Sequence, residues 1–408
     1  MKKSFLSLFA ALAASSLAAD TPVIRAETVT FSQNSSRLVT IGYTLESADA
    51  IVTVDVLTNG VSIGAENFTN IDGDVNRRVA PGDRIIVWQP RKSWPGHVFT
   101  HNEVSVELKA WDVTVPPDYM VIDLSYTNAP VRYYANANAL PDGGLANDIY
   151  RSTKLVMRRI PAAGNIWTMG SPSGEPDRVG ARETQHLVTM TNDYYLGVFP
   201  VTQAQHQLVV GSNPTPDDLR GSDYAPVSGE EYEPLRGATV SWPADGHVVG
   251  GGSHLRKWRN LTKIDLDLPT SAQWEFACRA GTGTAYYYGT DAASMGDYAW
   301  YSDNAGGKLH RVGEKIPNAW GLYDLYGNAW EWCLDWTGNH NSDPVVEPTG
   351  PADGSSDNNR RVGRGGDYAS AVGNCRSAKI NPQNVATTTG ASPHKTGYRL
   401  SCPTQLKW

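Results

Sequence analysis

The chain has 408 residues and a formal net charge of −7, from 35 basic and 42 acidic side chains. Because it shows no basic excess and no cluster of lysine and arginine interleaved with aromatic residues, nucleic acid is excluded as an expected partner. The length exceeds what one hydrophobic core usually serves, so two domains are expected. With 39 glycines, 25 prolines and 13 tryptophans, the composition predicts a turn-rich protein that is ordered by aromatic packing.

The first 19 residues have the pattern of an export signal. Lys2 and Lys3 precede an apolar run over residues 5–17, and small side chains follow before Asp20. No later stretch approaches the roughly 18 apolar residues of a membrane-spanning helix, and no cysteine follows the cleavage region to carry a lipid. We therefore expect an exported protein, periplasmic or secreted, with residues 1–19 as signal peptide and no membrane span.

The next segment, residues 20–115, alternates apolar and polar side chains with a period of two, which predicts half-buried antiparallel strands. Turn residues at short intervals separate the strands and suit an immunoglobulin-like β-sandwich. The segment shows no catalytic constellation. Strands are predicted at residues 37–43, 51–56, 84–88 and 103–108.

Residues 116–153 are predicted to be a connector, in which residues 119–122 can form a strand. A second, loop-rich α+β domain is predicted over residues 154–408. Its one clear helix begins after Pro269, with Thr270 as the N-cap, and ends at Gly281.

The most informative stretch, residues 317–332, sets two carboxylates among glycines and indoles. Asp324 and Glu331 are hard oxygen donors seven residues apart, and Gly327 and Asn328 allow a tight turn that aims main-chain carbonyls at the same point. This pattern suits a calcium site built from one loop. It equally suits a buried aromatic turn in which the two carboxylates satisfy the local backbone.

Eight motifs occur in a fixed order along the chain. Together they resemble the motifs of the formylglycine-generating enzyme family, also called sulfatase-modifying-factor-like proteins. The resemblance covers about 250 residues and implies a complex α+β fold related to C-type lectins, with little regular secondary structure. The motifs are Met169-Gly170-Ser171-Pro172, Glu183 with His186 and Val188, Pro200-Val201-Thr202-Gln203, Leu268-Pro269-Thr270 running into Trp274-Glu275-Phe276, the block from Asn318 to Trp332, Arg364-Gly365-Gly366, Cys375-Arg376-Ser377-Ala378 and Gly397-Tyr398-Arg399-Leu400.

The resemblance implies a calcium ion held by the side chains of Asp324 and Glu331 and the carbonyls of Gly327 and Ala329. A second calcium site of the family would fall around residues 300–301, where the matching donors are missing, and is not predicted here.

At the positions of the family's two catalytic cysteines, this chain departs from the family pattern. Formylglycine generators resemble one another in a Gly-Gly-Ser-Tyr-x-Cys segment with a second cysteine five residues on, and the two thiolates bind copper(I) and activate oxygen. Here Ser370 stands at the first cysteine position, Asp367 stands at the position of the preceding serine, and Cys375 falls at the second cysteine position.

The four cysteines, Cys278, Cys333, Cys375 and Cys402, predict one or two disulfides in an exported chain. The resemblance implies that Cys278 pairs with Cys375, which would leave no thiolate pair for copper. Cys333 and Cys402 are then a second bridge or two buried thiols.

Six histidines are not spaced in the way that metal ligands on a helix usually are. They are His186, His206, His247, His254, His310 and His340. None form an i, i+4 pair on a predicted helix, so they are interpreted as ordinary surface or turn residues, although loops can bring a metal triad together.

A related iron-dependent branch of the family takes its ligands largely from a helical domain that has no counterpart in residues 20–153. Residues 250–252 are interpreted as a flexible glycine loop.

Small and polar residues between fixed family motifs predict a ligand-binding surface over residues 367–374 and 381–395. The predicted contacts are Asp367, Tyr368, Ser370 and Asn374. The sequence thus favours an exported, atypical family member that binds a protein or carbohydrate ligand. The alternative is a formylglycine-generating oxidase that converts a sulfatase cysteine to formylglycine, with copper and catalytic positions at Ser370 and Cys375.

Overall fold

The computed structural model describes residues 21–64, 67–68, 70–96, 103–385 and 395–404. The predicted export signal therefore lies outside the described residues. Among the described residues, no helix is both long and apolar enough to cross a bilayer.

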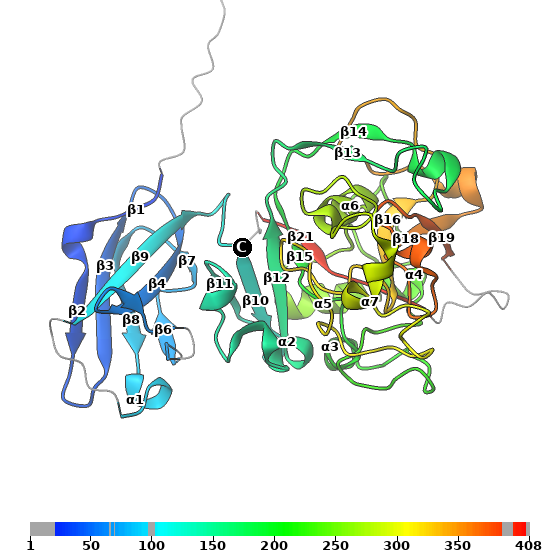
Figure 1. Ribbon diagram of the computed structural model, residues 1–408. Helices are drawn as coiled ribbons and strands as arrows, with labels where there is room; N and C mark the ends of the chain where they lie inside the picture. Colours follow the sequence, from blue (N-terminus) through cyan, green and yellow to red (C-terminus); the bar gives the residue numbers. More distant parts are fainter. Residues whose placement is uncertain (1–20, 65–66, 69, 97–102, 386–394, 405–408) are drawn as a thin grey trace, which may run out of the picture.

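The first part of the chain forms two antiparallel sheets, drawn in blue to cyan at one end of the molecule (Figure 1). All four strands predicted from the alternating pattern are present, as β3, β4, β8 and β9. The first sheet contains β1 (Val23–Ile24), β2 (Thr30–Gln33), β3 (Val39–Glu46), β6 (Ile71–Gly73) and β8 (Gly82–Trp88), and the second contains β4 (Ala50–Thr58), β5 (Val61–Ser62), β7 (Arg77–Val79) and β9 (Val104–Asp112).

The two sheets share one hydrophobic core. Alternate residues of β3, such as Val39 and Ile41, face Val52 and Val56 of β4 and are fully buried. Burying an aliphatic side chain stabilises a fold by roughly 1.5–3 kcal/mol, so the period-two pattern is enough to hold these sheets face to face.

The segment predicted to be a connector supplies two strands to the next sheet, whose order is β11-β10-β12-β15-β21. It also contacts the first part of the chain: the backbone N–H of Tyr133 donates to the carbonyl of Asn76 at 2.8 Å, and Ile51 packs in the same core as Met120. The predicted domain boundaries stay a prediction. The strands are β10 (Tyr119–Asp123), β11 (Val131–Tyr134), β12 (Lys154–Ile160), β15 (Tyr194–Gly197) and β21 (Ser401–Pro403).

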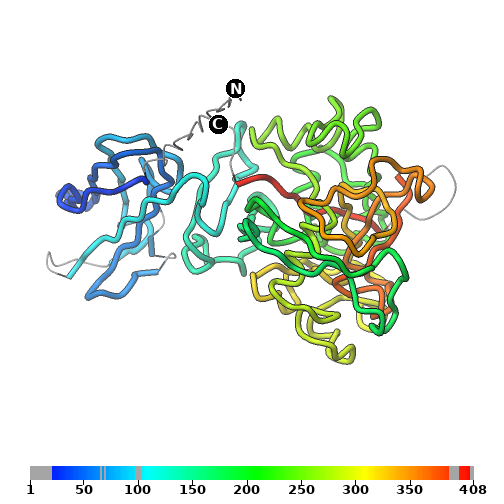
Figure 2. Tube along the Cα trace, turned by 90° about the horizontal axis from the view of Figure 1, so that it is seen from above, coloured from blue at the N-terminus to red at the C-terminus, as the bar shows by residue number. Residues whose placement is uncertain are grey.

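Two smaller sheets and long loops make up most of the remaining chain, green to orange in Figure 2. In one of them β16 lies between β18 and β20, so the aromatic run of the 317–332 block is buried against strands from much later in the chain. The sheets contain β13 (Ile166–Met169), β14 (His186–Thr189) and β17 (Val345–Val346), and β16 (Trp330–Trp336), β18 (Arg360–Arg364), β19 (Asn381–Asn384) and β20 (Thr396–Gly397).

The predicted helix is α6. Thr270 accepts a hydrogen bond from the N–H of Gln273 at 3.1 Å, and the Gln273 side chain accepts from the Thr270 N–H at 2.9 Å, which is a capping box. The sequence analysis missed two helices of similar length, α3 and α5. The helices are α1 (Pro90–Ser93), α2 (Ile149–Ser152), α3 (Gln203–Val210), α4 (Tyr232–Arg236), α5 (His254–Thr262), α6 (Ser271–Arg279) and α7 (Met295–Tyr298), with 3-10 turns η1 (Ala26–Thr28), η2 (Ala137–Ala139), η3 (Gly144–Ala146), η4 (Gly180–Glu183), η5 (Ala292–Ser294), η6 (Gly354–Asp357) and η7 (Val372–Cys375).

Candidate functional site

The turn between β18 and η7 is closed by hydrogen bonds between Asp367 and Ser370. The Ser370 hydroxyl donates to Asp367 Oδ1 at 2.6 Å and accepts from the Asp367 N–H at 3.0 Å. The Ser370 N–H donates to the Asp367 carbonyl at 3.0 Å. The two residues are only 3% and 7% exposed, so the serine hydroxyl is held as a structural group inside the turn.

Cys375 is sealed beneath this turn. Gly366 has φ +85°, and a Cβ there would come within 2.6 Å of Cys375 Sγ, so only glycine lets the backbone pass this close to the sulfur. Burial raises the pKa of the Cys375 thiol to about 12, with the Asp367 charge acting in the same direction. At neutral pH Cys375 is therefore a protonated, buried thiol, which is a poor nucleophile and a poor soft ligand.

The predicted ligand surface is largely covered. Asp367, Tyr368 and Ser370 are buried, and Asn374 is half-buried. Lys395 covers part of the turn, with its ammonium 3.6 Å from Asp367 Oδ2 and 5.3 Å from the Tyr368 ring centroid. In this segment the exposed side chains are those of Ala369 and Ala371. Of the second predicted stretch, residues 386–394 lie outside the described residues.

All four cysteines are buried and free, so the structure does not show the Cys278–Cys375 disulfide implied by the resemblance. The Cys278 thiol lies 3.8 Å from the Ser377 hydroxyl, and burial raises its pKa to about 12. Cys333 and Cys402 are likewise free thiols. The bridge stays a prediction, to be tested by thiol titration.

The predicted tight turn before β16 is present. Asp324, Gly327 and Asn328 have φ of 52°, 69° and 61°. A Cβ on Gly327 would lie 2.0 Å from the carbonyl oxygen of Trp300, so this position requires glycine. The sequence therefore predicted the backbone of this block correctly.

The carboxylates of the predicted calcium set are already engaged. Both Glu331 oxygens accept from Arg399, at 2.7 to 3.1 Å, and Oε2 also accepts from Trp274 Nε1 at 2.6 Å. Asp324 accepts from the Gly313 N–H at 2.6 Å, and burial raises its pKa to about 6. Because a calcium ion would have to compete with the Arg399 guanidinium for Glu331, this arrangement does not fit calcium held by Asp324, Gly327, Ala329 and Glu331. Titration with calcium tests whether the turn binds the ion.

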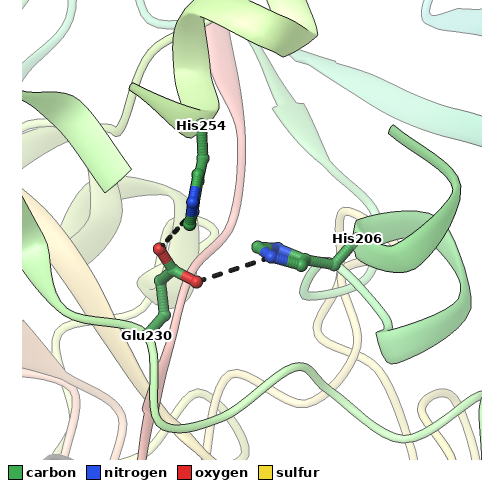
Figure 3. Close-up of side chains that lie close together, drawn as sticks. All are labelled: His206, Glu230 and His254. Atoms are coloured by element: carbon green, nitrogen blue, oxygen red, sulfur yellow. Dashed lines mark hydrogen bonds and ion pairs between the residues drawn. The ribbon is translucent and has the colours of Figure 1, made fainter. Parts of the chain in front are cut away.

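Two of the six histidines interpreted as ordinary residues meet at a carboxylate. His206, Glu230 and His254 offer ligand atoms that all lie within 4.8 Å of one another, and their side chains point toward a common centre (Figure 3). This cluster was not predicted from the sequence, because the two helices that carry the histidines, α3 and α5, were not predicted either. The signal was present: Thr202 and Gln205 form a capping box that starts α3 four residues before His206.

An open cleft of about 1060 Å³ lies elsewhere, between β4 and β9 on one side and residues 134–142 on the other. Its lining mixes charges, including Asp55, Glu107 and Lys109, and contains no histidine or cysteine. The cleft has room for a ligand.

Comparison with known proteins decides the family. The description "Sulfatase-modifying factor enzyme 1-like domain", of the formylglycine-generating type, matches residues 157–401, which is more than half of the chain. The chain belongs to this family. It is 30% identical over 251 residues to the formylglycine-generating enzyme of Bos taurus, covering 52% of this chain and 66% of that protein. It is 30% identical over 151 residues to the formylglycine-generating enzyme of Thermomonospora curvata, covering 33% and 48%.

The matches thus span less than two thirds of the length of these relatives of the formylglycine-generating enzyme family. Among solved structures, the Treponema denticola variable protein 1 aligns with a TM-score of 0.47 and 26% identity, over 62% of this chain and 96% of that one. PvdO from Pseudomonas aeruginosa aligns with a TM-score of 0.46 and 20% identity, over 61% and 94%.

Copper does not fit the two positions at which the formylglycine-generating enzyme family holds it. Ser370 supplies a hydroxyl that is bonded to Asp367, and Cys375 supplies a single protonated thiol in the core. Copper(I) prefers soft thiolate ligands, and neither Ser370 nor Cys375 supplies a thiolate here. We therefore derive no step through copper.

Proposed function

We propose that this chain is an atypical member of the formylglycine-generating enzyme family that binds a protein or carbohydrate ligand outside the cytoplasm, periplasmic or secreted, and does not oxidise cysteine. The observation that carries the proposal is the hydrogen bond from Ser370 to Asp367. At the place where the oxidase needs a thiolate, this chain has a hydroxyl locked into a turn.

The surroundings support the same conclusion. Cys375, at the second copper position, is buried and protonated at neutral pH. The turn over it is closed by hydrogen bonds between Asp367 and Ser370, and it presents Ala369 and Ala371 to solvent. A rigid scaffold that presents small exposed side chains is suited to binding, because such positions accept substitution without loss of the fold. The export signal predicted in residues 1–19 is the basis for proposing that binding takes place outside the cytoplasm.

The first experiment tests the loss of copper chemistry. We expect the purified protein, supplied with copper(I) and oxygen, to form no aldehyde on a Cys-x-Pro-x-Arg peptide. We also expect it to bind copper(I) no more tightly than a Cys375→Ser variant in a competition assay. Aldehyde formation, or copper affinity that depends on Cys375, would establish the oxidase alternative and overturn the proposal.

The second experiment tests the binding face. Ligands are identified on glycan and protein arrays and then measured with Ala369→Arg and Ala371→Arg, which place a large charged side chain on the exposed turn without filling the core. Val61→Arg, at a 69% exposed position on β5, is the matched control. We expect the two turn variants to weaken binding by about tenfold or more, as for a contact at the centre of an interface, and the control to have no effect. Unchanged binding in both turn variants would exclude this turn as the ligand face.

A further inference from the structure

The cluster of His206, Glu230 and His254 shares no residue with the turn at Ser370 and is not used in the proposed ligand binding. His206 lies in α3, Glu230 in the loop before α4, and His254 is the first residue of α5 (Figure 3). His206 is 0% and Glu230 1% exposed, while the His254 side chain is 21% exposed. We propose that these three side chains form a binding site for a divalent transition-metal ion of the zinc class.

His206 and Glu230 face each other with two buried atoms that lack hydrogen-bond partners among the described residues. His206 Nε2 and Glu230 Oε2 are 3.6 Å apart, which is too long for a hydrogen bond, and neither has a hydrogen-bond partner among the described residues. Buried polar atoms are normally paired, so two such atoms facing each other require an explanation. Two ligands that each lie about 2.0–2.2 Å from one tetrahedral zinc ion are separated by roughly 3.4 Å, which is close to the observed spacing.

The His206 ring is oriented by a contact with Tyr398. Trp258 Nε1 donates to the Tyr398 hydroxyl oxygen at 3.0 Å, and His206 Nδ1 lies 2.9 Å from the same oxygen. When Nδ1 carries the proton and donates to Tyr398, the Nε2 lone pair is directed at Glu230. Metal-binding histidines are held in this way, with the second ring nitrogen donating to an outer partner that fixes the tautomer.

A simple ion pair does not explain the facing of His206 and Glu230. The 3.6 Å separation of His206 Nε2 and Glu230 Oε2 is longer than the roughly 2.7–2.9 Å of a charge-assisted hydrogen bond. Both atoms are buried without a hydrogen-bond partner among the described residues, and an ion held between them would pair each of them.

The ligand types indicate the class of ion. Two imidazoles and one carboxylate suit zinc and neighbouring first-row ions, whereas calcium and magnesium prefer oxygen ligands throughout. His254 Nδ1 lies 2.7 Å from Glu230 Oε1, a hydrogen bond that metal binding would have to replace with a bond to the ion. Three protein ligands leave a coordination position open, and the partly exposed His254 side is where water or a further ligand would reach it.

The test uses the purified protein after chelator treatment, with cobalt(II) followed by visible absorbance and zinc(II) measured by competition with a chromogenic chelator. We expect a single equivalent of either ion to bind. Loss of an outer partner of a metal ligand typically costs 10–100-fold in affinity, so Glu230→Gln and His254→Asn, which remove ligands, should each weaken binding by about a hundredfold or more. The matched control, His247→Asn, changes a histidine outside the cluster and should stay within about twofold.

Two safeguards separate metal binding from folding. Glu230→Gln keeps the size of the side chain and can still accept from His254, so it should keep the wild-type melting temperature when chelator is present. His254→Asn leaves the buried Glu230 Oε1 without its 2.7 Å hydrogen bond, so its zinc affinity is measured below its own melting transition. Tyr398→Phe leaves all three ligands in place and should weaken zinc by about 10–100-fold through loss of the positioning contact. Absence of stoichiometric binding by the wild type, or equal loss in His247→Asn, would overturn the proposal. Neither result bears on the ligand face at Ala369 and Ala371.

Discussion

Arg399 and Glu331 form a fully buried ion pair that joins the start of β16 to the segment between β20 and β21. The guanidinium contacts both carboxylate oxygens of Glu331 and also donates to the carbonyls of Gly197 at 2.8 Å, Val198 at 2.9 Å and Tyr323 at 2.7 Å. One side chain thus satisfies the acceptors of three separate segments. Glu331, which the sequence predicted as a calcium ligand, forms this ion pair in the structure.

Arg399→Met should destabilise the protein by about 3–5 kcal/mol, because removal of one partner leaves a buried charge without compensation. The double variant Arg399→Met/Glu331→Met should lose less than the sum of the two single variants, since it removes both charges together. Urea unfolding measures these free energies.

The control for this ion pair is Arg78→Met, which breaks the exposed pair of Arg78 with Asp49 at 2.9 Å. It should change the free energy of unfolding by no more than about 1 kcal/mol. Equal effects at the buried and exposed pairs would contradict the assignment of Arg399 as the central buried contact.

Zinc and calcium should have different effects on the melting temperature of the chelator-treated protein. Zinc should raise the melting temperature of the wild type, because a ligand that binds only the folded state stabilises it by mass action, and it should have little effect on Glu230→Gln. Calcium should leave the melting temperature unchanged, since Arg399 and Trp274 already occupy Glu331. A rise in melting temperature with calcium that is absent in Glu331→Gln would show that the turn binds calcium after all.

Asp335 should give the protein a characteristic pH dependence. Burial raises the pKa of this carboxyl from 3.8 to about 6, although the Ser271 N–H donates to it at 2.7 Å. The folded state therefore holds this proton between pH 4 and 6, where the unfolded state has lost it. The stability contributed by the residue falls as pH rises through this window, by about 3 kcal/mol in total, and is constant above it.

The measurement for Asp335 compares urea unfolding of the wild type and Asp335→Asn at pH 4, 5, 6 and 7. The wild type should lose stability relative to the variant as pH rises, because asparagine has the same shape and does not titrate. A difference that does not change with pH would show that Asp335 ionises normally in the folded protein.

Thiol titration distinguishes the structure from the predicted disulfide. Burial raises the pKa of all four thiols, to about 12 for Cys278 and Cys375, so none should react with a thiol reagent in the native protein at pH 8. In denaturant without reductant, the structure predicts that four thiols react. Two reactive thiols, with Cys278 and Cys375 linked in a peptide map, would establish the bridge implied by the family resemblance.

The sequence by itself predicted the elements that depend on local rules. Period-two alternation placed β3, β4, β8 and β9, the Thr270 cap placed α6, and Gly327 with Asn328 placed the turn before β16. Each of these depends on steric preference or on hydrogen bonds between residues close in the chain. Such preferences are determined by a few neighbouring residues of the sequence. The order of the motifs likewise predicted the family.

Tertiary structure alone decided what each polar side chain does. Glu331 has its partner 68 residues away in Arg399, and Ser370 is buried although its segment is small and polar. His206 lies in α3, Glu230 in the loop before α4 and His254 in α5, so no spacing in the sequence records their convergence. The choice among ligand, cap and ion-pair partner depends on burial and on which charge lies opposite, and both are set by the packing of segments that are distant in the chain.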